Sequence, residues 1–577
     1  MKEKKMGIGL LVLCLMLGGS YSFCPKDCKC FDTPKKTVKC TKGGMTGPIP
    51  VKEIDTQTEF LTITAPEENE NSMTIGPIFQ EFQHLLKLEI THSNLPAIGK
   101  HTFWGVKKLQ RLTLTNNNIS QVLDYNFRGL ANLIELNLDH NRIESMGSGT
   151  FCHLPELKKL TLSNNHLKEL SPRLFLKLGK LSFLDLSYNN LGHLDPGVFK
   201  DVQDLVVLHC RGCALRTINP QIYSILSSLE DLDIGDNEFK YLDPYIFRDL
   251  KKLRTLLMDG NHFPVVLEPT FASQGKLETL NLARNRIAKV TTHAFDNLTS
   301  LRELDLSYNK LDKLEPTTFV PLADNLVKIA VSGNNIDISE FKYVLQVIRH
   351  VQDLYIADLG FTIHDLPLGL FAPLEELKFV NMSGNELTHL PVHLFSPVSN
   401  LISLDISRNK FHGLDERLIV KLESVVVYLD ENPWACDLCH ITAMLSRINE
   451  SQWIKKAVCS LPYNLKGRTL DSLTMNSLSW CGSGLGYRDE GFAGLALTHN
   501  TQLGLIAAGA AVALLVITMA AVVTGLLYNR HHAAFYYTNE EKRKAEQQKI
   551  YAEPEKKVSI ATIDEITKDP ELQVLAS

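Results

Sequence analysis

Cysteine is the residue type in this sequence whose spacing most directly suggests chemistry. Twelve cysteines occur among 577 residues, and eight of them form two groups of four on either side of a long repetitive region. The groups are Cys24, Cys28, Cys30 and Cys40, and then Cys436, Cys439, Cys459 and Cys481. Four such thiols bind one zinc ion or form two disulfides. For disulfides, each group of four has three pairings that the sequence alone leaves open.

A further pair, Cys210 and Cys213, has the C-x-x-C spacing of a redox dithiol. In the surrounding repeat, however, Cys210 replaces an inward leucine and Cys213 replaces an asparagine. We therefore expect two buried thiols that act as small apolar side chains. Cys152 is expected to be free, and the sequence leaves open whether it is reactive or pairs between chains. Cys14 lies in an N-terminal apolar run.

One histidine lies between acidic residues at a regular interval. Asp185, His209 and Asp233 are each 24 residues apart. On adjacent strands of one sheet, His209 would lie about 5 Å from both carboxylates. Negative charge favours the imidazolium, so we expect the pKa of His209 to lie above its usual value of about 6.5, with Arg211 and Asp231 beside it. A pH-sensitive binding patch is one interpretation, and a solvated histidine screened by salt is the other.

The interval of 24 residues also governs the apolar residues between positions 85 and 411. The pattern L-x-x-L-x-L-x-x-N-x-L recurs in strict register from Leu109 to Leu301 and with a looser period afterwards. An aromatic column repeats with it: Phe103, Phe127, Phe151, Phe175, Phe199, Tyr223, Phe247, Phe271, Phe295 and Phe319. Because residues alternate between the two faces of a strand, the leucines of L-x-L point inward and the residues beside them point outward.

No single turn of this repeat can bury its own apolar residues, so the turns must stack. Stacking predicts a parallel sheet on one side and the aromatic column on the other, convex side. The asparagine of each turn can bond backbone groups of its neighbours that would otherwise be buried and unpaired. The turn at Leu359 lacks this asparagine, and we expect a bulge and an interrupted hydrogen-bond ladder between Asn309 and Asn385.

The repeat and the cysteine groups together resemble the extracellular leucine-rich-repeat family of single-pass membrane receptors, with a Toll-like ectodomain but no Toll signalling domain. The spacing C-x3-C-x-C-x9-C is similar to the family's N-terminal cap, and Asn432-Pro433-Trp434-Ala435-Cys436 is similar to its C-terminal cap. The resemblance implies an α/β fold, a leucine-rich-repeat solenoid (horseshoe) with a concave parallel sheet, disulfide caps at both ends and one transmembrane helix. In place of zinc it implies the disulfides Cys24–Cys30, Cys28–Cys40, Cys436–Cys459 and Cys439–Cys481.

Two further apolar runs predict how the chain meets the membrane. Lysines precede a run from Met6 to Leu17 that is too short to span a bilayer, which indicates a secretory signal cleaved after Ser22. The run 503–528 has no charged residue and, at about 1.5 Å per residue, exceeds a hydrocarbon core of about 30 Å. The basic Arg530 belongs on the cytoplasmic side. We expect a type I single-pass protein of the plasma membrane with an extracellular ectodomain.

The predicted organisation therefore has seven parts. They are a signal peptide (1–22), an N-terminal cysteine cap (23–52), about 15 leucine-rich repeats (53–432), a C-terminal cysteine cap (433–482), a stem (483–502), a transmembrane helix (503–528) and a disordered cytoplasmic tail (529–577). The tail mixes charges with few large apolar residues, a composition typical of disorder. Its Tyr537-Thr538-Asn539 is a candidate adaptor site.

Charge and side-chain types narrow the function. With Lys+Arg 60, Asp+Glu 65 and a net charge of -5, the chain lacks the positive field that nucleic-acid binding needs. No nucleophile, base or metal ligands converge, so we expect no enzyme, no cofactor and no metal. The outward strand positions are either solvated repeat filler or a binding surface. Its ligand-binding candidates are Phe183, Asp185, Val207, His209, Arg211, Asp231, Asp233 and Leu257.

Four Asn-x-Ser/Thr sites predict a glycoprotein, at Asn118, Asn297, Asn381 and Asn449. Asn381 differs from the others because it lies on a predicted strand, between Val380 and Met382. A glycan there would project from the concave face and obstruct a protein ligand. Binding on that face should therefore favour its N-terminal two thirds.

The sequence thus predicts a cell-surface receptor or adhesion protein that binds an extracellular protein or glycan-bearing ligand and signals, if at all, through partners. Homo- or hetero-oligomers are compatible with it. Two alternatives stay open: a structural or matrix-organising surface protein without signalling, and a co-receptor or decoy in a Toll-like immune pathway. Deleting the tail distinguishes the first alternative, because a structural protein keeps its activity without residues 533–577.

Overall fold

The computed structural model describes residues 24–241 and 243–480. The predicted signal peptide (1–22), Cys481, the stem (483–502), the apolar run 503–528 and the tail (529–577) lie outside the described residues. Within the described ranges, no helix combines the length and the apolar character that crossing a membrane requires.

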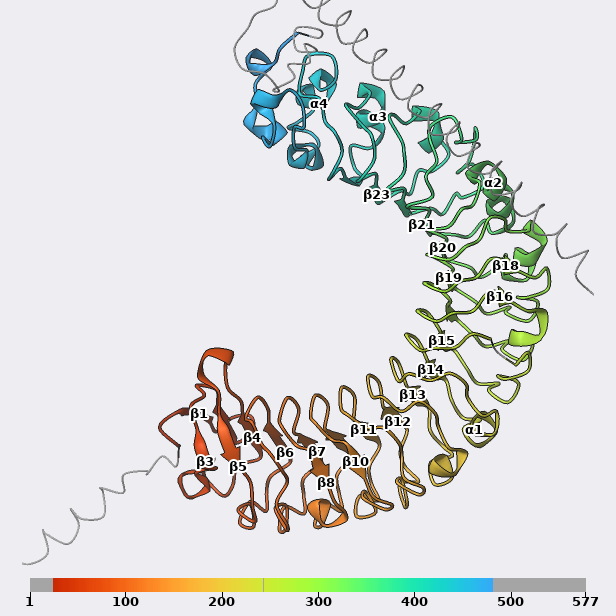
Figure 1. Ribbon diagram of the computed structural model, residues 1–577. Coiled ribbons are helices and arrows are strands. Elements are labelled where there is room, and N and C mark those ends of the chain that lie inside the picture. Colours follow the sequence, from red (N-terminus) through yellow and green to blue (C-terminus); the bar gives the residue numbers. More distant parts are fainter. Residues whose placement is uncertain (1–23, 242, 481–577) are drawn as a thin grey trace, which may run out of the picture. The chain divides into compact units, whose positions relative to one another are not determined.

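An 18-stranded sheet runs through the described part of the chain and lies along the inner edge of the curved repeat unit (Figure 1). Its first strand, β1 (Cys28–Phe31), is antiparallel to β2 (Thr37–Cys40), and from β2 onward the pairing is parallel. The parallel strands are β4 (Phe60–Ile63), β6 (Lys87–Ile90), β7 (Arg111–Thr113), β9 (Glu135–Asn137), β11 (Lys159–Thr161), β12 (Phe183–Asp185), β13 (Val207–His209), β14 (Asp231–Asp233), β15 (Thr255–Leu257), β17 (Thr279–Asn281), β19 (Glu303–Asp305), β20 (Lys328–Ala330), β21 (Asp353–Tyr355), β22 (Phe379–Asn381), β23 (Ser403–Asp405) and β24 (Val426–Tyr428).

Short helices and two-residue or three-residue strands form the other sides of the turns, and α1 to α3 lie along the outer edge in Figure 1. The α-helices are α1 (Gln221–Ile225), α2 (Ile338–Val347), α3 (Glu416–Lys421) and α4 (Thr442–Ser446). The 3-10 helices are η1 (Val51–Glu53), η2 (Glu67–Asn69), η3 (Asp124–Phe127), η4 (Pro196–Phe199), η5 (Glu268–Phe271), η6 (Pro316–Leu322), η7 (Val392–Phe395), η8 (Gln452–Lys456), η9 (Tyr463–Leu465), η10 (Leu470–Ser472) and η11 (Met475–Ser477). Three small parallel pairs are β3 (Thr46–Pro48) with β5 (Ser72–Thr74), β8 (Gln121–Val122) with β10 (Ser145–Met146), and β16 (Val265–Val266) with β18 (Lys289–Val290).

The core is a continuous stack of leucines and aromatic rings, as the period predicts. The central leucines of neighbouring strands pair in register, for example Leu160 with Leu184, and both are fully buried. On the outer side Phe127 stacks on Phe151 with ring centroids 5.7 Å apart, and neither ring is exposed. Because full burial of one such side chain contributes about 1.5–3 kcal/mol, the stack is the main source of stability.

The asparagine column forms the expected second ladder. Asn165 is representative: its Nδ2 donates to the carbonyls of Leu138 and Leu162, both at 3.0 Å, and its Oδ1 accepts from the amide of Ile143 at 3.0 Å. One buried side chain thus satisfies three buried backbone groups in two turns. This explains why an amide, which both donates and accepts, is preferred there.

The expected interruption near Leu359 was wrong for the strand ladder, although the column of asparagine side chains does skip this turn, between Asn334 and Asn385. Strands β19 to β22 pair without a break, although the interval between central residues widens to 25 and 26. Between β20 and β21, where the interval is 25, the turn contains α2, the longest helix among the described residues. The sheet tolerates the insertion because the ladder constrains only the three strand residues of each turn.

Disulfides close both ends of the stack with the pairing that the family resemblance implies. The structure contains Cys24–Cys30, Cys28–Cys40 and Cys436–Cys459. Cys439 is also disulfide-bonded, and its expected partner Cys481 lies outside the described residues.

Three cysteines in the described residues are free thiols. Cys210 and Cys213 are fully buried, as expected for apolar substitutes, and the Cys213 thiol donates to the Leu186 carbonyl at 3.1 Å, in the place of an asparagine amide. Cys152 is half-buried. The hydrogen bond with the neighbouring Cys213 and then burial raise the pKa of Cys210, which disfavours its thiolate and therefore redox chemistry.

Candidate functional site

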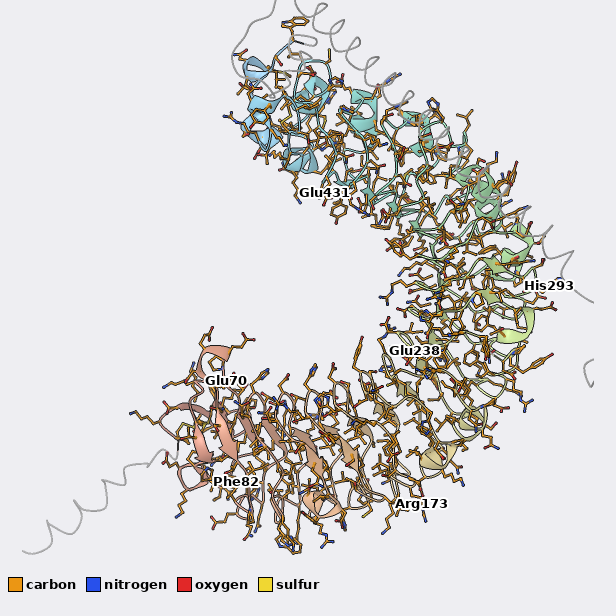
Figure 2. All side chains as sticks on the ribbon, in the orientation of Figure 1. Glu70, Phe82, Arg173, Glu238, His293 and Glu431 are labelled. Carbon is orange, nitrogen blue, oxygen red and sulfur yellow. A yellow bond between two sulfur atoms is a disulfide. The ribbon has the colours of Figure 1, made fainter. Side chains whose placement is uncertain are left out.

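The outward side chains of the sheet form columns along the concave face, and these columns hold the candidate binding residues. Figure 2 shows side chains projecting from the inner edge, near Glu238 and Glu431, while Arg173 and His293 lie at the outer edge. Phe183 pairs in register with Val207, and Asp185 pairs with His209. Neighbouring residues of one column therefore lie about 5 Å apart on adjacent strands.

Phe183, Val207 and His209 form one group, here called the anchor patch. The rings of Phe183 and His209 meet edge to face, with centroids 5.3 Å apart. Lys159 lies over the other side of Phe183, with Nζ 4.5 Å from the ring centroid, a cation–π distance. All three residues of the patch are half-buried, so the patch is partly exposed to solvent. An aromatic and an aliphatic side chain beside a positive charge have the composition of a protein-binding anchor.

The pKa of His209 is raised, as predicted, but its main partner is not the one expected. Burial lowers the pKa, and the hydrogen bond and charge of Asp231, with smaller contributions from Asp185 and Asp233, more than offset it. His209 Nε2 lies 3.3 Å from Asp231 Oδ1. Asp231 lies diagonally opposite His209 on β14. Asp233, which is in register with His209, binds Arg211 instead. The imidazole of His209 is therefore directed toward the carboxylate of Asp231 rather than toward that of Asp233.

Asp233 is held by Arg211 in a group of five charged residues, here called the arginine network. Arg211 donates from Nε to Asp233 at 2.9 Å, from Nη1 to Asp236 at 2.6 Å and from Nη2 to Asp259 at 2.6 Å. Arg284 bonds Asp236 at 3.2 Å and also Asp259. Burial lowers the pKa of Arg211, but these bonds outweigh it and raise the pKa. The predicted ligand contacts Arg211 and Asp233 are therefore used within the fold.

A glycine explains how one guanidinium reaches two turns along the stack. Arg211, Gly235 and Asp259 occupy the same position in three successive turns. A Cβ on Gly235 would come within 2.6 Å of both terminal nitrogens of Arg211. The absence of a side chain there lets the guanidinium pass over the middle turn. An Arg–Gly–Asp series at the repeat interval was visible in the sequence, but our sequence reasoning missed it, together with Asp236 and Arg284.

The remaining predicted residues, Asp185 and Leu257, are neighbours of these groups, in register with His209 and with Asp233. Asp185 accepts a hydrogen bond from the backbone amide of Ser187 at 2.9 Å and so supports the local turn. Leu257 is half-buried on β15, in register with Asp233. Of the eight candidates, the three residues of the anchor patch and Asp231 form one surface in the structure. Arg211 and Asp233 belong to the arginine network.

A second group of apolar side chains lies toward the C-terminal end of the concave face, and the sequence reasoning missed it. We call Tyr355, Phe379, Val426 and Tyr428 the aromatic patch. The rings of Tyr355 and Phe379 are 4.9 Å apart, and Val426 and Tyr428 are about half exposed, at 50% and 46%. The signal was present as outward Tyr and Phe residues on the strands, one of them two residues before Asn381, whose outward position the sequence analysis did assign.

The four glycosylation candidates have different surroundings. Asn118 Nδ2 donates to Asn94 Oδ1 at 2.9 Å, and Asn297 Nδ2 donates to the Ala272 carbonyl at 2.7 Å. Asn381 lies on the concave strand β22, as expected, and Asn449 is exposed in the C-terminal cap. At Asn381 and Asn449, no group in the described part of the chain accepts a hydrogen bond from Nδ2.

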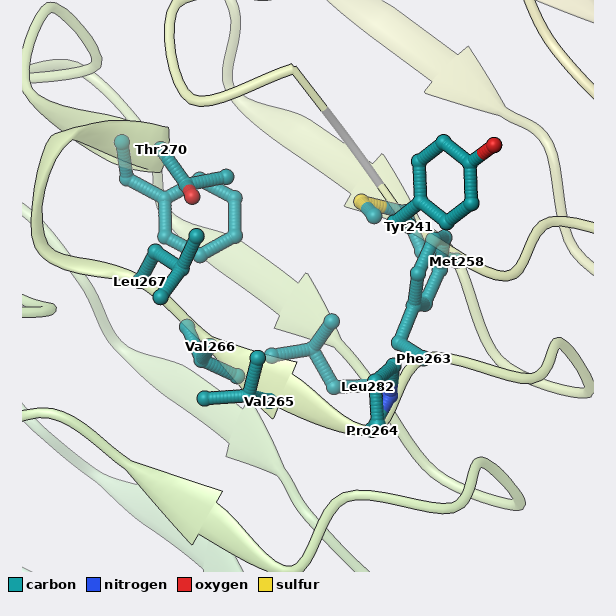
Figure 3. A pocket seen from close by; sticks show the side chains of 10 residues that line it. Tyr241, Met258, Phe263, Pro264, Val265, Val266, Leu267, Thr270 and Leu282 are labelled. Carbon is teal, nitrogen blue, oxygen red and sulfur yellow. The ribbon is translucent and has the colours of Figure 1, made fainter. Parts of the chain in front are cut away.

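Two open, polar hollows of about 560 and 380 Å³ lie beside Tyr188 and beside Tyr308, and an apolar one is smaller. Figure 3 shows an apolar pocket formed by Tyr241, Met258, Phe263, Val266 and Leu267, among others. Its volume is about 50 Å³, far below the roughly 300–1,000 Å³ typical of ligand pockets. Within residues 24–241 and 243–480, no cluster of three His, Cys, Asp or Glu side chains is arranged to hold a metal ion.

Comparison with known proteins identifies the repeat. The sequence profile described as leucine rich repeat matches residues 107–167, 155–215, 203–263 and 275–336, so the chain contains leucine-rich repeats. A solved leucine-rich-repeat protein of Leptospira interrogans is 23% identical, with a TM-score of 0.50, and the match covers 68% of this chain and 94% of that chain. This likeness supports the fold alone. No curated protein matches the sequence.

Two other solved structures are more distant in shape. A chain of the Drosophila Toll–Spatzle complex is 19% identical, with a TM-score of 0.46, over 75% of this chain and 62% of that chain. Human trophoblast glycoprotein, 5T4, is 29% identical over 40% of this chain and 89% of that chain, with a TM-score of 0.37.

Proposed function

We propose that this chain is a cell-surface leucine-rich-repeat protein that binds an extracellular protein on its concave face, with the anchor patch at the centre of the contact. The supporting observation is the juxtaposition of Phe183, Val207 and His209 on the adjacent strands β12 and β13. Stacked repeats commonly serve as interaction scaffolds because their sheet offers one extended concave surface.

A macromolecular ligand fits this surface better than a small molecule. The anchor patch is open and lies among charged side chains, with Lys159 on one side and Asp231 on the other. Protein interfaces combine a small apolar centre with a polar rim in this way. We propose binding rather than catalysis, because the groups that face solvent here can hold a partner but do not form a nucleophile–base pair.

The cell-surface assignment rests on the sequence and on the cysteines. The N-terminal run 1–22 and the uncharged run 503–528 have the properties of a secretory signal and a membrane span. Disulfides such as Cys24–Cys30 and Cys436–Cys459 persist in oxidising compartments and are rare in the cytosol. In this arrangement the repeats face the extracellular space and residues 529–577 form the cytoplasmic tail.

The proposal is tested by capturing partners with the full chain displayed on cells. Surface proteins cross-linked to the wild-type chain are identified by mass spectrometry, and the capture is repeated with Phe183→Ser combined with Val207→Ser. Loss of an interface hot spot typically costs about 2–4 kcal/mol, which lowers affinity by about thirty- to a thousandfold. We therefore expect the specific partner to be lost from the double variant.

A matched control is Val320→Ser, because Val320 is 58% exposed but belongs to η6, away from the sheet. This variant should capture the same partner as wild type. Equal capture by the wild-type chain and the Phe183/Val207 variant, at equal surface expression, would exclude the anchor patch as the binding site.

The role of the bound complex is tested by deleting residues 533–577. A receptor that signals through an adaptor loses its response in this variant while it still binds the partner. A matrix-organising protein keeps its full activity, which would favour the structural alternative. Turnover of any substrate by the purified chain would contradict the assignment as a non-enzyme.

A further inference from the structure

The aromatic patch surrounds one asparagine. Asn381 pairs in register with Tyr355 on β21 and with Asp405 on β23, and Asp405 pairs with Tyr428 on β24. Phe379 precedes Asn381 by two residues on the same strand and therefore lies on the same face. Tyr355 lies about 5 Å from Asn381 across the sheet, and Tyr428 lies about 10 Å away in the other direction.

The side chain of Asn381 is oriented for attachment. Its Oδ1 accepts a hydrogen bond from the Ser383 amide at 2.9 Å, which fixes the plane of the side-chain amide. Nδ2 has no acceptor within the described part of the chain, in contrast to the engaged amide nitrogens of Asn118 and Asn297. Asn381, Met382 and Ser383 form the sequence Asn-x-Ser that N-glycosylation requires.

We propose that Asn381 carries an N-linked glycan whose first sugars pack on Tyr355, Phe379 and Tyr428, so that the occupant of the aromatic patch is the chain's own glycan. The proposal rests on the proposed cell-surface function, because N-glycans are added in the secretory pathway. It assigns the aromatic patch to shielding and leaves the anchor patch as the protein-binding part of the concave face.

The chemistry of the patch matches this occupant. The faces of pyranose rings present C–H groups that lie flat against the negative face of an aromatic ring, while their hydroxyl edges stay in water. Tyr355 and Tyr428 supply such faces on both sides of Asn381, and Asp405 between them accepts hydrogen bonds from hydroxyls. The apolar side chains of the patch lie on both sides of β23, whose outward Ser403 and Asp405 are polar, and exposed apolar groups of this kind mark sites of contact with another group. A glycan attached to Asn381 covers these side chains without a second molecule.

The test compares two tyrosines of nearly equal exposure. Tyr428, on β24, is 46% exposed, and Tyr188, which follows β12 ten strands away along the sheet, is 49% exposed. The full chain is produced in a eukaryotic secretory host, the glycopeptide containing Asn381 is identified by mass spectrometry, and nitration of both tyrosines by tetranitromethane is followed with time. In the wild-type chain we expect Tyr428 to react several-fold more slowly than Tyr188. In Asn381→Gln this difference should be lost.

Further variants separate the glycan from the side chain. Ser383→Ala removes the glycosylation sequence but keeps Asn381, and it should behave as Asn381→Gln does. Ser383→Thr keeps the sequence and should retain the slow reaction of Tyr428. Asn449→Gln removes a glycan in the C-terminal cap and should leave both tyrosines unchanged.

The outcomes distinguish this inference from the proposed function. An unmodified Asn381 beside a glycosylated Asn449, or a glycosylated Asn381 with Tyr428 reacting as fast as Tyr188, overturns the inference alone. If none of Asn118, Asn297, Asn381 and Asn449 carries a glycan in the secretory host, the proposed cell-surface function is contradicted as well.

Discussion

Replacing Arg211 by methionine removes the cation that joins three turns of the stack. The side chains of Arg211, Asp233 and Asp259 are only 17%, 11% and 6% exposed, so their charges are poorly solvated without each other. Breaking a buried ion pair from one side typically costs about 3–5 kcal/mol. Arg284 keeps its bonds to Asp236 and Asp259 in the variant, so we expect the lower end of this range, about 3 kcal/mol.

Native-state amide exchange is the suitable assay because a repeat stack opens locally and each turn contacts only its neighbours. A loss of about 3 kcal/mol corresponds to exchange that is about a hundredfold faster. We expect this acceleration in β13, β14 and β15, with little change in β6 and β7. The matched control is Arg254→Met, because Arg254 is 52% exposed and its pairs with Glu230 and Glu278 are surface pairs worth about 1 kcal/mol or less.

The effect of Arg211→Met should depend on pH. Burial raises the pKa of Asp259, but the hydrogen bonds and charges of Arg211 and Arg284 outweigh it and lower the pKa below 3.8 in the folded chain. A carboxylate whose pKa is lowered by folding stabilises the fold. This stabilisation is complete above the pKa of the unfolded chain and is lost as the pH falls through the pKa of the folded chain. The difference between the wild-type chain and the variant should therefore be largest above about pH 4 and shrink in stronger acid. If Arg211→Met changes exchange no more than Arg254→Met does at neutral pH, the arginine network does not stabilise the fold.

Three further variants test other parts of the structure. Gly235→Ala should destabilise the fold by about 1–3 kcal/mol, because its Cβ would displace the guanidinium of the network, whereas Gly147→Ala has open space and should be neutral in denaturant titrations. Cys436→Ser combined with Cys459→Ser should lower stability by about 2–5 kcal/mol and reduce surface expression; unchanged thermal unfolding would show that this disulfide does not support the cap. The pKa of His209 is raised in the folded chain, so its protonation stabilises the fold. This stabilisation is complete below the unfolded pKa of about 6.5 and is lost as the pH rises through the folded pKa. Partner affinity and stability should therefore change between about pH 7.4 and 5.5, and His209→Gln should abolish that change.

The repeat period was sufficient to predict the strands, the buried columns and the face on which each candidate lies. These features depend only on alternation along a strand and on stacking, so Phe183 and Val207 appear side by side as expected. The free and buried state of Cys210 and Cys213 followed from the same register. The pairing of Cys24 with Cys30 came from the family resemblance, because spacing alone allows three pairings.

The partners of charged side chains could not be predicted in the same way. His209 binds the diagonally placed Asp231 because Asp233 already binds Arg211. Which carboxylate each side chain binds depends on side-chain length and direction rather than on strand register. Arg211 in turn reaches Asp259 only because Gly235 lies between them.

The period is less regular toward the C-terminal end of the repeats. The strands stay in register across the intervals of 25 and 26 residues around Leu354, which the changed period did not reveal. The outward position of Phe379 followed from that of Asn381 two residues later, but this step was not taken and the aromatic patch was overlooked.

The turn at Leu359 determines where the stack should first give way under load. In a linear array the end units usually loosen first, but here covalent bonds such as Cys24–Cys30 and Cys436–Cys459 secure the first and last units. The weakest contact between neighbouring turns then lies inside the stack rather than at one of its ends. At Leu359 the strands stay paired, yet a leucine side chain can neither donate nor accept the bonds that Asn309 and Asn385 make in their own turns. A chain pulled between its two ends, or exposed briefly to a protease, should separate there into two unequal parts that each retain one closed end.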